Sequence, residues 1–305
     1  MTRVRPLRWH DIPLAYRLAG HGTSFDTQLI TTVGDDILYH ALLTGLRRTQ
    51  MFVMRTPGVP TLGQLHYPPE QQSARLSYVA PALRHNGSED AWLELFDGLS
   101  EMAGQRGIIS LVAEVNEGLP EIEVLRRGQF GVYGRQSIWR RAPGPIGQEQ
   151  AALRPARTAD VMSMQGLYTT LIPGLLRQVE PSPMDTGDSY VLDGGNGGIS
   201  GMVIGYRGLH ASLIEIYLAS SETTVMQPFL NAALANFDGA ARPVYCRLRY
   251  VEWLVGAMDE VGFEHVWAQV VMVRHMAAHI RRPDFEAVSA GLEGKASLPT
   301  SIRIK

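Results

Sequence analysis

The sequence contains one seven-residue pattern twice, about 150 residues apart. The pattern reads Arg-Pro-x-Arg-x-x-Asp, and it begins at Arg5 and again at Arg154. Each copy is followed by a helical pattern, several strand-like runs and a helix that ends near a Gly and a Phe, at 128–130 and at 262–263. Self-similarity at this period indicates two related domains in tandem, and it constrains the fold more than any other feature of the chain.

The length of 305 residues agrees with the repeat, because it suggests two domains of roughly 150 residues each. We expect a first domain at 1–141, a linker at 142–151, a second domain at 152–285 and a polar tail at 286–305. The linker is placed where proline and glycine cluster, since neither helices nor strands accommodate such a run well.

Charge and composition exclude several classes of partner. The net charge of −2, with 45% hydrophobic and 19% charged residues, is typical of a globular protein. No run of Lys or Arg stands out, so we expect neither nucleic acid nor a membrane surface as a partner. Cys246 is the only cysteine, which precludes an intrachain disulfide and fits a cytoplasmic location. Because Cys246 lies in a strand-like run, we interpret it as a core residue rather than a nucleophile.

The two halves repeat one order of elements, which predicts an α/β class with mixed sheets. The first half is predicted to contain a helical region at 11–48, strands at 50–55, 61–67, 74–80, 108–115 and 132–140, and helices at 89–105 and 120–127. The second half is predicted to contain a helical region at 159–178, strands at 189–192, 199–206, 211–219, 244–249 and 263–273, and helices at 221–237 and ending at 260. Ser88 is the expected N-cap of the helix at 89.

Two other patterns are candidates for binding sites. The glycine-rich run at 193–198 stands between two strands, which favours a hairpin turn over a phosphate loop. His275 and His279 are four residues apart, a spacing that suits two metal ligands on a helix. No third ligand stands nearby, so surface histidines are favoured and no metal site is predicted.

The order of elements, the repeated Arg-Pro-x-Arg-x-x-Asp pattern and the closing helix–Gly–Phe–strand together resemble the Gcn5-related N-acetyltransferase (GNAT) family. Each half resembles the family separately, and together the two halves make up nearly the whole chain. The resemblance therefore implies two tandem GNAT-like acyltransferase domains. It is more specific for the fold than for an activity.

The resemblance implies a site for acetyl-CoA where the fourth and fifth strands of a domain separate. In the family, a loop of the pattern Pro-x-x-Arg/Gln-x-x-Gly-x-Gly/Ala opens a helix and holds the pyrophosphate on its N–H groups. Pro81, Arg84 and Gly87 match this pattern, whereas Glu89 and Asp90 put carboxylates where a phosphate needs positive potential. The candidate cofactor-binding residues are therefore Val79, Ala80, Arg84, His85, Asn86, Gly87 and Ser88.

The corresponding loop of the second half, at 220–224, contains no glycine and is shorter. Ser221 there is interpreted as a plain helix cap with acidic support from the residue that follows it, Glu222. The sequence therefore favours the first half as the place of the cofactor.

Glu215 is the best candidate for a catalytic base. Acetyl transfer requires a group that takes the proton of the attacking amine, and Glu215 resembles by position the carboxylate that the family places on its fourth strand. Its apolar neighbours predict a raised pKa. The alternative is a glutamate at the edge of the sheet, or in a salt bridge, without a catalytic role.

The acid that would protonate the leaving thiolate is harder to identify. The family uses a Tyr in the helix after the fifth strand. Its position is occupied by Val124 in the first half and by Met258 in the second. Tyr78 and Tyr217 are candidate substitutes, although tyrosines in strands are more often packing residues. Asn116 resembles an Asn that is common after the family's fifth strand.

Three functions remain open at this stage. The first is an acetyl-CoA-dependent N-acyltransferase acting on a small amine or peptide amine. The second is a non-catalytic, degenerate tandem module that binds a ligand or partner. The third is an enzyme of this fold that uses another acyl donor, such as an aminoacyl carrier. The acceptor and the oligomeric state cannot be predicted from the sequence.

Overall fold

The computed structural model describes residues 4–34, 48–55, 60–68, 71–180, 187–194, 198–219, 223–249 and 252–276. The elements of the first half are β1 (Arg5–Pro6), the 3-10 helix η1 (Trp9–Asp11), α1 (Ile12–Leu18), β2 (Thr23–Ser24), α2 (Thr27–Val33), β3 (Thr49–Met54), β4 (Thr61–His66), β5 (Ser73–Ala80), η3 (Leu83–His85), α4 (Glu89–Gly104), β6 (Ser110–Asn116), α5 (Glu121–Arg127) and β7 (Gly131–Arg141). Those of the second half are β8 (Leu153–Pro155), η4 (Thr158–Asp160), α6 (Val161–Leu171), α7 (Gly174–Val179), β9 (Asp188–Asp193), β10 (Ile199–Arg207), β11 (Ser212–Leu218), α8 (Thr223–Asn236), β12 (Val244–Leu248), η6 (Glu252–Leu254), α9 (Val255–Glu260) and β13 (Phe263–His275).

The predicted strands and the long helices α4 and α8 are confirmed to within about three residues. The hairpin between β9 and β10 is confirmed by their antiparallel pairing. The helical region predicted at 11–48 is interrupted by β2, which was not expected, and its part at 35–47 lies outside the described residues. His275 lies in a strand, so the helical spacing assumed for the histidine pair is wrong, and His279 lies outside the described residues.

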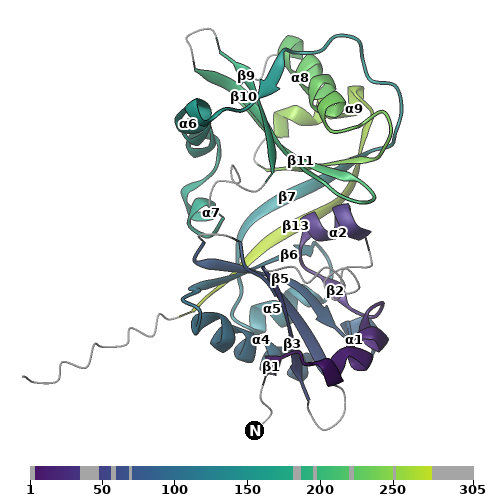
Figure 1. The fold of residues 1–305 in the computed structure, drawn as a ribbon, viewed down its shortest axis with the longest axis vertical. Helices are drawn as coiled ribbons and strands as arrows, with labels where there is room; N and C mark the ends of the chain where they lie inside the picture. The colour runs from purple at the N-terminus through teal and green to yellow at the C-terminus, as the bar shows by residue number, and fades with distance from the viewer. Residues whose placement is uncertain are drawn as a thin grey trace, which may run out of the picture.

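All the described strands belong to one mixed sheet, and this sheet joins the two halves. Its order is β1-β3-β4-β5-β6-β13-β7-β12-β11-β10-β9-β8, with β2 on β5. The last strand of each half leaves its own half: β13 pairs with β6 and β7 pairs with β12, while β7 and β13 run antiparallel to each other. Figure 1 shows this pair crossing the middle of the molecule, with the first half below and the second above. Each half is therefore completed by a strand of the other.

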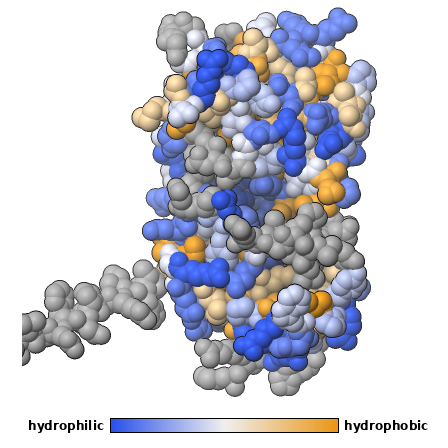
Figure 2. All heavy atoms as spheres, viewed as in Figure 1, coloured by the Kyte–Doolittle hydropathy of each residue, from blue (hydrophilic) through white to orange (hydrophobic). Residues whose placement is uncertain are grey.

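Helices α4 and α8 pack on the sheet through apolar stripes at helical spacing. In α4 the stripe contains Trp92, Leu95, Phe96 and Leu99, all fully buried. In α8 it contains Phe229, Leu230, Ala233 and Leu234, and Phe237 continues it one residue beyond the end of the helix. Ser88 caps α4 as predicted, since its Oγ accepts a bond of 3.3 Å from the N–H of Ala91. The face drawn in Figure 2 has its hydrophobic residues scattered among hydrophilic ones, apart from the grey atoms.

The repeated Arg-Pro-x-Arg-x-x-Asp pattern forms the same structure twice. In the first copy the guanidinium of Arg5 binds both carboxylate oxygens of Asp11, at 2.7 and 3.0 Å. In the second copy Arg154 binds Asp160 in the same way, at 2.6 and 2.9 Å. Such bidentate pairs fix the chain as it enters the first helix of each half. The pattern is thus a structural device of the fold.

Candidate functional site

The sheet contains two places where parallel strands pair and then separate. Strands β5 and β6 pair from Ser73 to Arg75 on β5 and diverge beyond it. Strands β11 and β12 pair from Ser212 to Glu215 on β11 and diverge in the same way. We call the space between residues 76–80 and 113–116 the N-terminal fork. The C-terminal fork is the space beside residues 216–218, where β11 continues beyond its pairing with β12. Diverging strands leave backbone N–H and C=O groups that need other partners.

The N-terminal fork is filled by the protein's own chain. Strand β2 pairs with β5, with Thr23 opposite Val79 and Ser24 opposite Tyr78. The next residue, Phe25, reaches both edges. Its N–H donates to the carbonyl of Ser77 on β5 at 2.9 Å, and its carbonyl accepts from the N–H of Glu114 on β6 at 2.9 Å. Residues 21–26 thus occupy the position that the resemblance assigns to the cofactor.

The segment at 21–26 is anchored as part of the core. The ring of Phe25 is buried and packs edge-on against Trp92 at 5.8 Å between centroids. Asp26 caps α2 by accepting a hydrogen bond of 3.2 Å from the N–H of Leu29. A Cβ atom on Gly22 would lie 2.0 Å from the ring of Tyr78, so glycine is required where the segment enters the fork. The expected cofactor position in the first half is therefore closed in this structure.

The glycine loop that follows β5 is folded on itself. The N–H groups of His85 and Gly87 both donate to the carbonyl of Ala82, at 2.8 and 2.9 Å. A Cβ atom on Gly87 would lie 2.6 Å from the carbonyl oxygen of Pro81. Arg84, like His85, is exposed. Two of the amides that would hold a pyrophosphate are therefore already bonded within the loop.

The remaining cofactor candidates lie around this loop. Val79 and Ala80 are buried in β5 beside β2, Asn86 has a left-handed backbone with φ of 63°, and Ser88 caps α4. The carboxylate of Glu89 is paired with Arg127 at the end of α5. The loop candidates are thus grouped at one edge of the sheet, but the fork that they border is occupied.

The C-terminal fork differs from its counterpart. No strand among the described residues pairs with β11 on the side of β12 beyond Glu215, whereas the pairing with β10 continues to Leu218. Helix α8 begins at Thr223 and has no acidic residue in its first turn. Residues 220–222, which connect β11 to α8, lie outside the described part of the chain.

Glu215 is buried in β11 and held by two partners. Its Oε1 accepts a hydrogen bond of 2.9 Å from Arg247 on β12, and its Oε2 accepts one of 2.7 Å from the phenol of Tyr217. Burial favours the protonated form, but the charges of Arg247 and Arg249 and the Tyr217 hydrogen bond outweigh it, so the pKa of Glu215 lies below its usual value. The raised pKa that we expected is wrong, and the salt-bridged alternative describes this side chain.

Glu215 belongs to a larger buried ionic cluster between the two halves. We call it the central cluster; its members are Arg75, Glu114, Glu180, Glu215, Arg247 and Arg249. Arg75 and Glu114 come from the first half and the others from the second. Three arginines face three glutamates, so the cluster is neutral when all six are charged. Buried charges require such pairing.

No protein-family model and no curated protein sequence matches this chain. Among solved structures, a tandem GNAT protein from the clavulanic acid biosynthesis pathway is 15% identical, with a TM-score of 0.51 over 90% of this chain and 98% of the other. A GCN5-related N-acetyltransferase from Sphaerobacter thermophilus is 10% identical, with a TM-score of 0.54 over 90% and 95%.

The chain has the tandem GNAT fold. The predicted fold is therefore confirmed, with both halves included in the match. At these identities the likeness establishes an acyltransferase fold and leaves the activity to be argued from the site.

The two other catalytic candidates of this tandem GNAT fold have structural partners. The phenol of Tyr78 donates to the carbonyls of Leu18 and Ala19 at the end of α1, at 3.2 and 2.7 Å. Asn116 accepts a hydrogen bond of 2.8 Å from the amide of Gln269 on β13. Tyr78 and Asn116 lie on the two strands that border the N-terminal fork, and Glu215 lies in the other half. The structure does not bring the three into one site.

Cys246 is fully buried on β12, and burial raises the pKa of its thiol. It is a core residue in this structure. The described residues contain no group of three or more His, Cys, Asp or Glu side chains that could hold a metal ion. No helix in the described ranges is long and apolar enough to cross a bilayer.

Proposed function

We propose that the chain is an acyl-CoA-dependent N-acyltransferase with a single donor site, located in the C-terminal fork. The observation that carries the proposal is the difference between the forks. Residues 21–26 bond to both edges of the N-terminal fork, while no described strand enters the C-terminal one. The unpaired backbone edge at 216–218 offers the N–H and C=O groups that a pantetheine amide can bind.

The helix that follows each fork supports the same choice. A helix N-terminus attracts a diphosphate through its free N–H groups and its dipole. Helix α4 carries Glu89 and Asp90 in its first turn, and these carboxylates oppose a phosphate. The first turn of α8, counted from Thr223, carries no carboxylate, and Glu222 directly before it lies outside the described residues.

The chemistry follows from the side chains at the fork. The nitrogen of a small amine or peptide amine attacks the thioester carbon, the C–S bond breaks, and CoA leaves as the thiolate. Glu215 is held by Arg247 and Tyr217, so the amine loses its proton to water instead. Acceleration then comes from holding donor and acceptor together. The rate should rise about tenfold per pH unit until the acceptor amine itself is deprotonated.

The test is release of free CoA from acetyl-CoA in the presence of a panel of small amines and peptides. We expect turnover with at least one acceptor and a log-linear rise with pH. A plateau near neutral pH that disappears in Glu215→Gln would instead assign the base role to Glu215.

One observation favours a second candidate, a non-catalytic module that binds acyl-CoA or another ligand. Burial and then the neighbouring Glu215 charge raise the pKa of Tyr217 well above its usual value, and its proton is committed to Glu215. Neither a free base nor a free acid is therefore present among the candidates. Saturable acetyl-CoA binding without turnover of any acceptor would select this function.

A further inference from the structure

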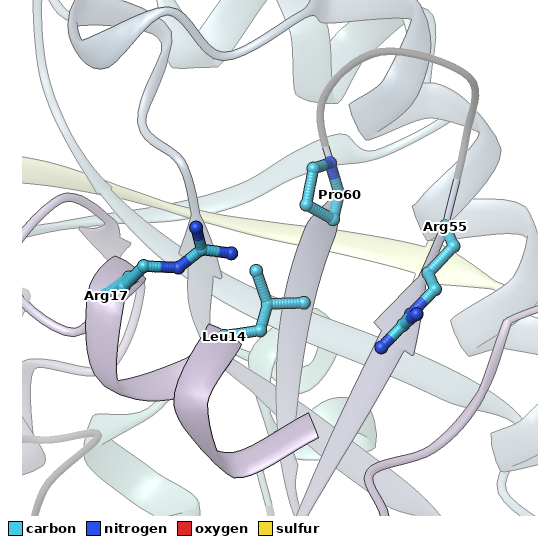
Figure 3. Close-up of a pocket in the computed structure, with 4 residues that line it drawn as sticks. All are labelled: Leu14, Arg17, Arg55 and Pro60. Carbon is cyan, nitrogen blue, oxygen red and sulfur yellow. The ribbon is translucent and has the colours of Figure 1, made fainter. Parts of the chain in front are cut away.

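A small open cavity lies on the first half, apart from both forks. Its volume is about 250 Å³, and it is lined by Leu14 and Arg17 of α1, Arg55 after β3 and Pro60 before β4. In Figure 3 the two arginines lie on opposite sides of Leu14. Leu14 is buried, so the cavity combines an apolar floor with two guanidinium groups at its rim.

The charges at this cavity are not balanced. Arg55 binds Asp11 at 2.9 Å, but Asp11 also accepts both hydrogen bonds of Arg5. Arg17 is exposed and forms no hydrogen bond or ion pair with any described residue. Arg5 and Arg55 thus share the single carboxylate of Asp11, and Arg17 adds a positive charge without a described acidic partner.

The second half provides an internal comparison. Arg5 is opposite Val53 in the first half, and Arg154 is opposite Val191 in the second. Arg55 and Asp193 therefore occupy equivalent positions, two residues further on. Asp193 binds Arg154 at 2.6 Å. One arginine there faces two aspartates, whereas the first half has two arginines and one aspartate at the same places.

The cavity side chains differ between the halves as well. Counted from Asp11 and Asp160, Arg17 corresponds to Gly166 and Leu14 to Ser163. The repeated fold therefore does not require either cavity residue. The first half alone combines a positive rim with an apolar floor at this position.

We propose that this cavity binds a small organic anion, a carboxylate or phosphate attached to a short apolar group. Guanidinium groups bind both oxyanions through paired N–H donors, and Leu14 with Pro60 would cover the apolar group. The volume lies below the range of about 300–1,000 Å³ for drug-sized ligands, so a small anion fits the cavity better than a nucleotide or CoA. The proposal does not depend on the proposed acyltransferase function.

The test is a titration of the full chain, at constant ionic strength, with butyrate, acetate and inorganic phosphate. Binding is followed by nitrogen-15 NMR on the arginine Nε–H signals, with the Arg17 signal assigned by its absence in Arg17→Gln. We expect saturable binding of butyrate, about tenfold tighter than acetate because of two additional buried methylene groups. Tighter binding of phosphate with the same dependence on Arg17 would assign the site to phosphate esters.

Two variants and one matched control keep the test specific. Arg17→Gln should weaken binding at least about tenfold, because a charged hydrogen-bond partner is lost. Arg55→Asp, which introduces the residue type found at the equivalent Asp193, should abolish binding. Arg8→Gln removes the same charge from an exposed residue that does not line the cavity. Melting temperatures check that each variant is folded. Equal affinity of Arg8→Gln and Arg17→Gln, or no saturable binding of any probe, would overturn the proposal.

Discussion

The central cluster makes a quantitative prediction for Arg249→Met. The Arg249 guanidinium contacts Glu180 and, at 3.3 Å, Glu114, and it donates to the side-chain oxygen of Gln136 at 2.7 Å. Without it, Glu180 keeps only the 3.3 Å contact with Arg75 among its described ion-pair partners. A buried charge that loses its partner in this way costs about 3–5 kcal/mol.

The expected change in melting temperature follows from the size of the chain. An unfolding entropy of about 2.1 cal/mol/K per residue gives roughly 0.6 kcal/mol/K for 305 residues. Arg249→Met should therefore lower the melting temperature by about 5–8 °C, measured by calorimetry at pH 7. Because the cluster joins the halves, we expect a single transition in both proteins.

Two controls separate this effect from the loss of any arginine. Arg126→Met removes an exposed partner of Glu123 and should cost less than about 1 kcal/mol. The double variant Glu180→Met with Arg249→Met removes both charges, and it should recover most of the stability lost in the single variant. If Arg249→Met costs no more than Arg126→Met, the charges are not held away from water and the reasoning fails.

Three further predictions concern stability and reactivity. Nearby arginine charges outweigh burial and lower the pKa values of Glu114 and Glu215, so their ionised carboxylates stabilise the fold above their ordinary pKa. The free energy of unfolding should therefore fall as pH drops below about 4.5, and a free energy that does not change with pH would contradict this. Gly22→Ala should destabilise the protein by about 1–3 kcal/mol, since its Cβ would overlap the Tyr78 ring. A denaturant titration that shows no loss of unfolding free energy would mean that the segment at 21–26 can leave the fork. Cys246 should react with a thiol reagent only at the rate of global unfolding, and rapid labelling of the native protein would disagree with its burial.

Much of the fold could be predicted because its signals are local. Each copy of the seven-residue pattern, the apolar stripe of α4 and the cap at Ser88 lie within short stretches of the chain, and all are present in the structure. The exchange of β7 and β13 could not be predicted, since an alternating strand pattern does not identify its neighbour in the sheet. Strand β2 has only two residues, too few to show any periodicity.

The candidate site was predicted less well, because its chemistry depends on contacts between distant residues. The apolar neighbours of Glu215 suggested a raised pKa, but Arg247 lies beside it on the next strand and favours the charged form. Arg247 in a strand with an otherwise apolar pattern was the available signal, since a buried arginine requires an acidic partner. The glycine loop at 81–88 was located correctly, yet its sequence does not reveal that residues 21–26 fill the adjoining fork.

The most direct test of the proposed single donor site is calorimetric titration of acetyl-CoA with one charge variant in each half. Thr224→Glu puts a carboxylate in the first turn of α8, and Arg84→Glu puts one in the loop of the first half. A carboxylate about 6 Å from a phosphate costs about 0.7 kcal/mol in water and about 3 kcal/mol at an effective dielectric constant of 20. We predict one site per chain, weakened about 3- to 100-fold by Thr224→Glu and unchanged by Arg84→Glu. Two sites, or a loss of affinity confined to Arg84→Glu, would contradict the account.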